Sequence, residues 1–390
     1  MRHADRFLQL QNRLASHQEL WRPAPFHQAR PAWTRSHPAL AAEVLALDET
    51  ALEGLAADPD AAGDWLGRRL PGLAELRALS QFGLLPRRDL AAAAASAAES
   101  VPARKRSQIE AFAAVAPPLH APVVEWCAGK GHLGRRLALV DGVDVHSLER
   151  DPTLCAEADR LAGRAGVRQR SECVDVLAGT MAERLRDREV VALHACGELH
   201  RSLVRGAERA GALGYRIVPC CYHHGVDGRY RPLSPPAALP LGSAELRMAV
   251  TELVTAPSGA RRRLARDQAW KLGFKAMADA LELPLQATFR PVPTAWLAGD
   301  FEQFCRALAS REGVRLPTHL DSERWLVAGE RRRAEVRRLE LVRHAFRRSL
   351  EAWLVLDLVI ALEAAGFAVA LGEFCARELT PRNLMLLARA

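Results

Sequence analysis

The sequence predicts an α/β protein built on a doubly wound, mostly parallel β-sheet. Short apolar runs recur from Pro122 onward and are separated by Gly, Asp or Glu. Helical stretches alternate with these runs, as consecutive strand–helix–strand units require. A glycine-rich segment, EWCAGKGHLG (125–134), overlaps the end of the first run. Such a segment is typical of a strand-to-helix turn that lies against a ligand.

Seven strands are expected, and their order along the chain sets the architecture. A helix at 351–365 leads into the last two strands, which form an antiparallel pair. Five parallel strands closed by such a pair resemble the seven-stranded sheet of Rossmann-like methyltransferases. The expected strands are 123–128, 143–149, 170–177, 190–197, 215–221, 367–376 and 382–390.

The rest of the chain is divided around this sheet. The alanine-rich run at 90–100 fits either a helix or a linker. The predicted segments are a mainly helical N-terminal region (1–98), a Rossmann-like core (99–224), a helical insertion after strand five (225–345), and a last helix with two strands that complete the core sheet (346–390).

Composition indicates a folded protein, because 49% of the 390 residues are hydrophobic and 26% are charged. The N-terminus lacks the apolar core of a signal peptide, and the most apolar late stretch (352–371) carries Asp357 and Glu363. We therefore expect a cytoplasmic protein without a membrane span. The eight cysteines form no C-x-x-C pair, so reduced thiols are expected and no metal site is predicted.

Gly129, Gly131 and Gly134 have the spacing G-x-G-x-x-G, which suits a nicotinamide dinucleotide or S-adenosyl-L-methionine. The carboxylate of Glu125 would be repelled by a pyrophosphate, but it would attract a sulfonium and an ammonium. This residue favours S-adenosyl-L-methionine. Lys130 precedes a glycine instead of Ser or Thr, so the segment is not a P-loop.

Two more acids follow the next strands. Glu149 ends the second strand, where a carboxylate can accept hydrogen bonds from both ribose hydroxyls. Asp175 follows the third strand and suits the adenine amino group. The alternatives are that these acids cap helices, or that the chain is a nicotinamide-dependent oxidoreductase. The predicted cofactor residues are Glu125, Ala128, Gly129, Gly131, Glu149, Asp175, Val176 and His194.

Strands four and five end in HACGEL (194–199) and PCCYHH (219–224), so their side chains should meet at one edge of the sheet. A histidine could act as a general base, or two cysteines could attack and release a cytosine base. Zinc binding by two cysteines and two histidines, or a purely structural role, are further alternatives. The candidate catalytic residues are His194, Cys196, Cys220, Cys221 and His223.

These strand ends, together with RKRSQIEAF (104–112) and LTPRNLMLLA, resemble a family. It is the class I methyltransferase-like proteins that include the glutathione S-transferase C-terminal domain-containing protein. The eukaryotic acceptor-stem tRNA 2′-O-methyltransferases are more distantly similar. The resemblance covers 104–224 and 351–390, and it implies the fold, S-adenosyl-L-methionine binding and an RNA substrate. It assigns the cofactor to Glu125, Gly129, Gly131, Glu149 and Asp175, with 194–197 and 220–223 lining the reaction site. No Asp-Pro-Pro-Tyr motif or Lys-Asp-Lys-Glu set is present, which leaves the acceptor atom open.

Basic segments offer contacts for a polyanion, since the net charge is +8. Arginine holds phosphates well, but a helix at 321–350 could equally pair its nine arginines with its five acids. GARRRLAR (259–266) and RKR (104–106) are the other clusters. We therefore expect an S-adenosyl-L-methionine-dependent methyltransferase that modifies RNA, either tRNA or rRNA. The alternative is a binding protein that keeps the fold without turnover, and the oligomeric state stays open.

Overall fold

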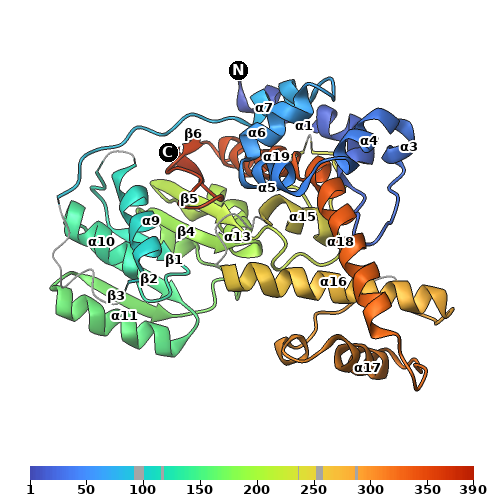
Figure 1. The fold of residues 1–390 in the computed structure, drawn as a ribbon. Coiled ribbons are helices and arrows are strands. Elements are labelled where there is room, and N and C mark those ends of the chain that lie inside the picture. The colour runs from blue at the N-terminus through green and yellow to red at the C-terminus, as the bar shows by residue number, and fades with distance from the viewer. Residues whose placement is uncertain (92–100, 116–117, 236, 252–257, 286–288) are drawn as a thin grey trace. The chain divides into compact units, whose positions relative to one another are not determined.

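The structure is a computed structural model that describes residues 1–91, 101–115, 118–235, 237–251, 258–285 and 289–390. It contains two compact units (Figure 1). The sheet unit comprises Met1–Ala15, Glu75–Glu252 and Arg347–Ala390, and the helical unit comprises Ser16–Ala74 and Leu253–Phe346. The helical unit thus combines most of the predicted N-terminal region (1–98) with most of the predicted insertion (225–345). The larger part of the alanine-rich run, 92–100, lies outside the described residues.

The sheet unit contains a seven-stranded sheet with the order β3-β2-β1-β4-β5-β7-β6. Strand β7 runs antiparallel to both of its neighbours, and the other neighbouring strands pair in parallel. This order confirms the predicted fold class. The strands are β1 (Val123–Trp126), β2 (Val145–Glu149), β3 (Gln169–Cys173), β4 (Glu189–Cys196), β5 (Gly214–Cys220), β6 (Ala368–Glu373) and β7 (Leu384–Arg389).

Helices cover this sheet and bury its central strands, as apolar parallel strands require. All four residues of β1 and all seven of β5 are buried. Helix α10 packs against β1 and β2, α11 against β3, α13 against β4 and α19 against β6. The helices of this unit are α1 (His3–Ser16), α7 (Leu73–Ser80), α9 (Ala103–Ala114), α10 (His132–Asp141), α11 (Pro152–Ala165), α12 (Ala182–Leu185), α13 (Glu198–Arg205), α14 (Ala207–Ala210), α15 (Ser243–Val250) and α19 (Arg347–Ala364).

The start of α11 is encoded locally and fixes the backbone after β2. The Asp151 side chain caps the helix by accepting a hydrogen bond from the Thr153 N–H at 2.8 Å. Pro152 occupies the first helical position, where its missing N–H is not needed, and Gly166 ends the helix in the left-handed conformation. These signals hold the end of β2, and Glu149 with it, at a defined position.

The helical unit is organised around the crossing of two long helices, α16 and α18. A Cβ on Gly273 would meet the Trp325 carbonyl oxygen at 2.5 Å, so the two backbones approach closely there. The helices of this unit are α2 (Gln18–Trp21), α3 (Trp33–Ser36), α4 (Pro38–Leu45), α5 (Glu49–Ala57), α6 (Pro59–Gly67), α16 (Ser258–Ala280), the 3₁₀ helix η1 (Thr294–Leu297), α17 (Phe301–Glu312) and α18 (Ser322–His344).

The arginines of α18 bind mainly within their own unit. Arg332 donates to the Pro25 carbonyl oxygen at 2.6 Å, Arg338 to that of Leu47 at 2.8 Å, and Arg343 to that of Trp21 at 3.0 Å. Arg337 pairs with Glu49. The predicted continuous helix at 321–350 is wrong, because α18 ends at His344 and α19 begins at Arg347.

None of the helices within the described ranges combines the length and the apolar character needed to cross a bilayer.

Candidate active site

The segment after β1 forms a tight loop before α10. Gly129 and Gly131 have φ angles of 57° and 62°, in the left-handed region that strains other residues. A Cβ on Gly131 would also collide with the Gln169 side-chain amide. The Ala128 N–H donates to the Leu148 carbonyl oxygen at 3.0 Å, which ties the loop to the end of β2. The predicted glycine loop therefore needs its glycines for backbone conformation.

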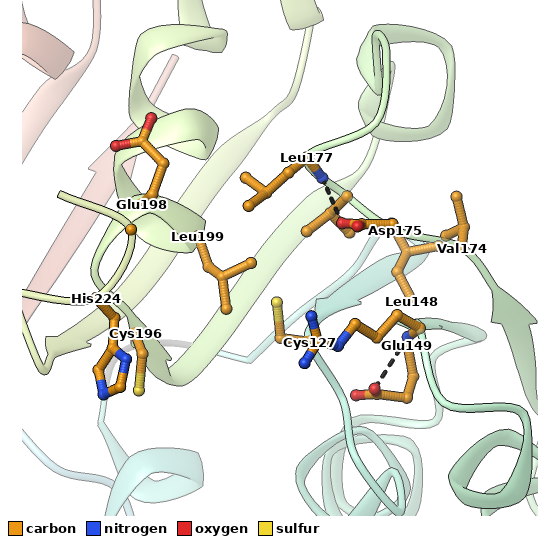
Figure 2. Close-up of a pocket in the computed structure, with 13 residues that line it drawn as sticks. Cys127, Leu148, Glu149, Val174, Asp175, Leu177, Cys196, Glu198, Leu199 and His224 are labelled. Atoms are coloured by element: carbon orange, nitrogen blue, oxygen red, sulfur yellow. Dashed lines mark hydrogen bonds between the residues drawn. The ribbon is translucent and has the colours of Figure 1, made fainter. Parts of the chain in front are cut away.

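Glu149 holds this loop through hydrogen bonds to the backbone. One carboxylate oxygen accepts from the Gly129 N–H at 2.9 Å, and the other accepts from the N–H groups of Arg150 at 2.9 Å and Asp151 at 3.1 Å. Figure 2 shows the Glu149 side chain at the edge of a cavity beside the loop. The carboxylate is therefore fixed in one orientation before any ligand arrives.

A cavity of about 300 Å³ lies beyond the ends of β1, β2, β3 and β4, which is within the range for small-molecule sites. Asp175 lines it, with one carboxylate oxygen accepting from the Leu177 N–H at 2.9 Å. Glu149 and Asp175 thus come from two consecutive strand ends and face one space (Figure 2). The lining residues are Cys127, Leu148, Glu149, Arg150, Val174, Asp175, Val176, Leu177, Cys196, Glu198, Leu199, His224 and Gly225.

Glu125 does not line this cavity. Its carboxylate is 3% exposed and accepts hydrogen bonds from the Ser147 hydroxyl at 2.9 Å and the Gln169 amide at 3.4 Å. It also accepts from the Gly134 N–H, and burial raises its pKa to about 7 against the lowering effect of the hydrogen bonds from Ser147 and Gly134. Its side chain thus supports the glycine loop from below, whereas the sequence predicts a contact with the cofactor.

The loops after β4 and β5 contact each other closely. A Cβ on Gly197 would collide with the carbonyl oxygen of His224, and the Glu198 N–H donates to that oxygen at 2.9 Å. The Gly197 N–H donates to the Cys220 carbonyl oxygen at 3.0 Å. This packing brings His224 and Cys196 to the cavity wall.

The two histidines predicted as catalytic do not line the cavity. His194 lies at a bulge of β4 with a φ of 62°, and its Nε2 is 3.3 Å from the Gln108 side-chain oxygen. Burial lowers the pKa of His194 to about 4. The ring of His223 lies 4.4 Å from that of His224, and burial lowers the pKa of His223. Of the three histidines, His224 is the one that lines the cavity.

Three thiols gather at the ends of β4 and β5. The sulfurs of Cys196 and Cys220 are 3.2 Å apart, and those of Cys196, Cys220 and Cys221 all lie within 4.8 Å of one another. Hydrogen bonds from the other two thiols lower the pKa of Cys221, and the bond with Cys196 raises that of Cys220. The three predicted cysteines therefore form one cluster, which we call the thiol triad.

Three cavity residues lie beside the predicted catalytic and cofactor residues without being among them, although His224 was expected at this edge of the sheet. Cys127 is inside the glycine loop, and burial raises its pKa to about 12. Glu198 follows the strand-four motif and pairs with Arg201 at 3.2 Å and Arg205 at 2.6 Å. His224 is the last residue of PCCYHH. The sequence signal that could have identified them as site residues is that each lies in or next to a recognisable motif.

Residues 104–226 match the family model described as a methyltransferase domain. The segment that holds the glycine loop and both strand-end motifs is therefore similar to a methyltransferase domain, which agrees with the broad family that the resemblance implied. This match does not distinguish the type that includes the glutathione S-transferase C-terminal domain-containing protein from the acceptor-stem tRNA 2′-O-methyltransferases. Both of these narrower resemblances therefore remain predictions. No curated protein matches the chain.

Several solved structures are also similar to the chain at low sequence identity. TYW2 of P. horikoshii in complex with MeSAdo has 20% sequence identity, with 35% of this chain and 48% of that chain covered and a TM-score of 0.26. The cyclopropane synthase MmaA2 from Mycobacterium tuberculosis has 13% identity, with 75% and 87% covered and a TM-score of 0.27. The chain spans 42% and 43% of the lengths of two further solved structures that it matches.

Proposed function

We propose that this protein is an S-adenosyl-L-methionine-dependent methyltransferase that acts on RNA. One observation carries the proposal. Glu149 and Asp175, from consecutive strand ends, line one cavity beside a glycine loop, inside a segment that matches a methyltransferase domain. Carboxylates in this arrangement suit an adenosine, whose ribose hydroxyls and adenine amino group both donate hydrogen bonds.

The proposed cofactor contacts follow from this arrangement. Glu149 accepts from the ribose hydroxyls, and Asp175 with Val176 contacts the adenine. Ala128, Gly129 and Gly131 bring the loop backbone close to the ligand. Glu125 acts indirectly, by holding the loop through the Gly134 N–H.

The reaction proposed is an in-line displacement. S-adenosyl-L-methionine, when bound, would supply the methyl group to a lone pair of the acceptor atom and would leave as S-adenosylhomocysteine. His224 is our candidate for the base that takes up the proton lost by the acceptor, because it is the histidine among the residues that line the cavity.

Exposed basic segments support an RNA substrate. Arg104, Lys105 and Arg106 are exposed at the start of α9, in the unit that holds the cavity. In the helical unit, Arg261, Arg262, Arg263 and Arg266 are exposed on α16. The arginines of α18 are less suitable, because Arg332 and Arg338 are only partly exposed, Arg343 is buried, and all three bind carbonyl oxygens of their own unit. We assign the phosphate contacts to the α9 and α16 segments.

The cofactor part is tested by calorimetry with S-adenosylhomocysteine. Glu149→Gln and Asp175→Asn should each weaken binding by about tenfold or more, since one charge-assisted hydrogen bond contributes about 1.5–3 kcal/mol. Glu183→Gln, which removes an exposed carboxylate on α12, should bind like the unchanged protein. Tight NADH binding without S-adenosylhomocysteine binding would instead favour an oxidoreductase.

The substrate part is tested by transfer of a labelled methyl group to total RNA and to total protein. Label in RNA that is lost in the His224→Ala variant supports the proposal. Label in protein alone would refute the RNA substrate and keep the methyltransferase. Cofactor binding without any transfer would favour the binding protein without turnover.

A further inference from the structure

We propose that the thiol triad, Cys196, Cys220 and Cys221, binds one zinc ion at the wall of the cofactor cavity. The inference does not depend on methyl transfer, because metal binding can be measured without cofactor or substrate.

The spacing of the three sulfurs fits a metal ion of this size. Zinc binds thiolate sulfur at about 2.3 Å, so two sulfurs in a tetrahedral site lie about 3.8 Å apart. In the triad, the Cys196 and Cys220 sulfurs are 3.2 Å apart, and all three are within 4.8 Å of one another. These distances bracket the required value, so small side-chain rotations would complete the site.

The backbone fixes the three residues relative to one another. Cys196 and Cys220 are directly paired in the register of β4 and β5, and Cys221 follows at once with a left-handed φ of 45°. Such a conformation is costly for a residue other than glycine, and it is found where the surroundings enforce it. It lets two consecutive cysteines contribute to one cluster, which an extended strand would direct to opposite faces.

The thiols also share an acceptor. The His194 carbonyl oxygen lies 3.2 Å from the Cys220 sulfur and 3.6 Å from that of Cys196. Both S–H groups therefore converge on one region. On metal binding the thiol protons would leave to solvent, and zinc would replace them as the shared partner of the sulfurs.

Three thiolates define the kind of metal and leave one position open. Soft sulfur ligands select zinc and copper(I) over magnesium or calcium. Because Cys196 lines the cavity, the fourth position of a tetrahedral ion would face that cavity. Three thiolates and one divalent ion together carry one negative charge. The positive charge of Arg382, which acts on Cys196 and Cys221, would partly balance it.

The test uses the full chain, reduced, stripped of metal and then loaded with Zn²⁺ alone. We expect one zinc per chain, and we expect Cys196→Ser or Cys221→Ser to weaken binding by at least about 100-fold, since loss of an outer partner already costs about 10–100-fold. Cys173→Ser is the matched control, because Cys173 is exposed and outside the triad. Zinc binding that is unchanged in both triad variants would overturn the proposal.

A second measurement avoids the risk that a variant fails to fold. Alkylation of the unmodified sequence, with and without Zn²⁺, is mapped by mass spectrometry. Zinc should protect Cys196, Cys220 and Cys221 and leave the exposed Cys173 as reactive as before. Protection of other cysteines, or no zinc uptake by the fully reduced chain, would show that the triad is not a metal site.

Discussion

Replacement of Glu125 by glutamine tests whether a buried carboxylate under the glycine loop destabilises the fold at neutral pH. The folded state raises the pKa of Glu125 from 4.5 to about 7, mainly through burial. Below the lower value the group is protonated in both the folded and the unfolded chain. Above the higher value it is ionised in both states. The folded chain must then keep a charge on Glu125, a residue that is only 3% exposed. The stability contributed by the neutral carboxyl group is therefore lost as pH rises between these two values.

The size of the effect follows from the same two values. At about 1.4 kcal/mol for each tenfold change in proton affinity, a rise from 4.5 to about 7 corresponds to about 3 kcal/mol. Most of this, about 2.5 kcal/mol, should develop between pH 5 and pH 8. The neighbours that face Glu125 are Ser147, Gln169 and Gly134, and the charges of Arg135 and Lys105 act in the opposite direction to burial.

The assay is urea denaturation of the unliganded protein at both pH values. Glu125→Gln should gain about 2.5 kcal/mol relative to the unchanged protein on going from pH 5 to pH 8, because glutamine carries no charge. Glu183→Gln removes an exposed carboxylate and should show no such change. The reasoning is refuted if the stability difference between Glu125→Gln and the unchanged protein is the same at both pH values.

Gly134→Ala should lower the free energy of unfolding by about 1–3 kcal/mol in urea denaturation, because its methyl group would meet the Glu125 carboxylate at 2.5 Å. Asp357→Ala should cost about 3 kcal/mol or more in thermal unfolding, since it leaves the Tyr230 hydroxyl and the N–H groups of Leu233 and Ser234 without their acceptor. Asp357→Asn should recover part of this loss. Gly329→Ala should speed hydrogen exchange in α16 and α18, because its methyl group would collide with a carbonyl oxygen of α16.

Two glycines provide matched controls for the steric predictions. Gly163 on α11 and Gly54 on α5 are exposed helical positions where a Cβ would meet nothing within 4 Å. Alanine there should leave stability unchanged or raise it slightly. Losses equal to those at Gly134 and Gly329 would mean that close packing is not the cause.

An Asp357→Ala protein that unfolds like the unchanged chain would contradict the role given to that carboxylate.

The sequence by itself determined the sheet and the chemical character of its edge. Alternation of apolar runs with helices predicted all seven strands, because buried parallel strands and amphipathic helices have different periodicities. Glu149 and Asp175 could be assigned to the edge of the sheet where the cavity lies, because each is at or near the end of a strand and parallel strands end on the same side. Local signals such as Asp151, Pro152 and Gly166 are likewise readable without a structure.

Contacts between distant segments decided the rest. Glu125 lies one strand residue from the loop, yet its direction depends on packing against β2, β3 and α10, which no local pattern encodes. The thiol triad depends on the register of β4 with β5 and on the bulge at His194. The break between α18 and α19 carries no proline or glycine signal, and the pairing of residues 16–74 with 253–346 joins segments far apart in the chain. Such features arise from the lowest free energy of the whole fold, so only the tertiary structure shows them.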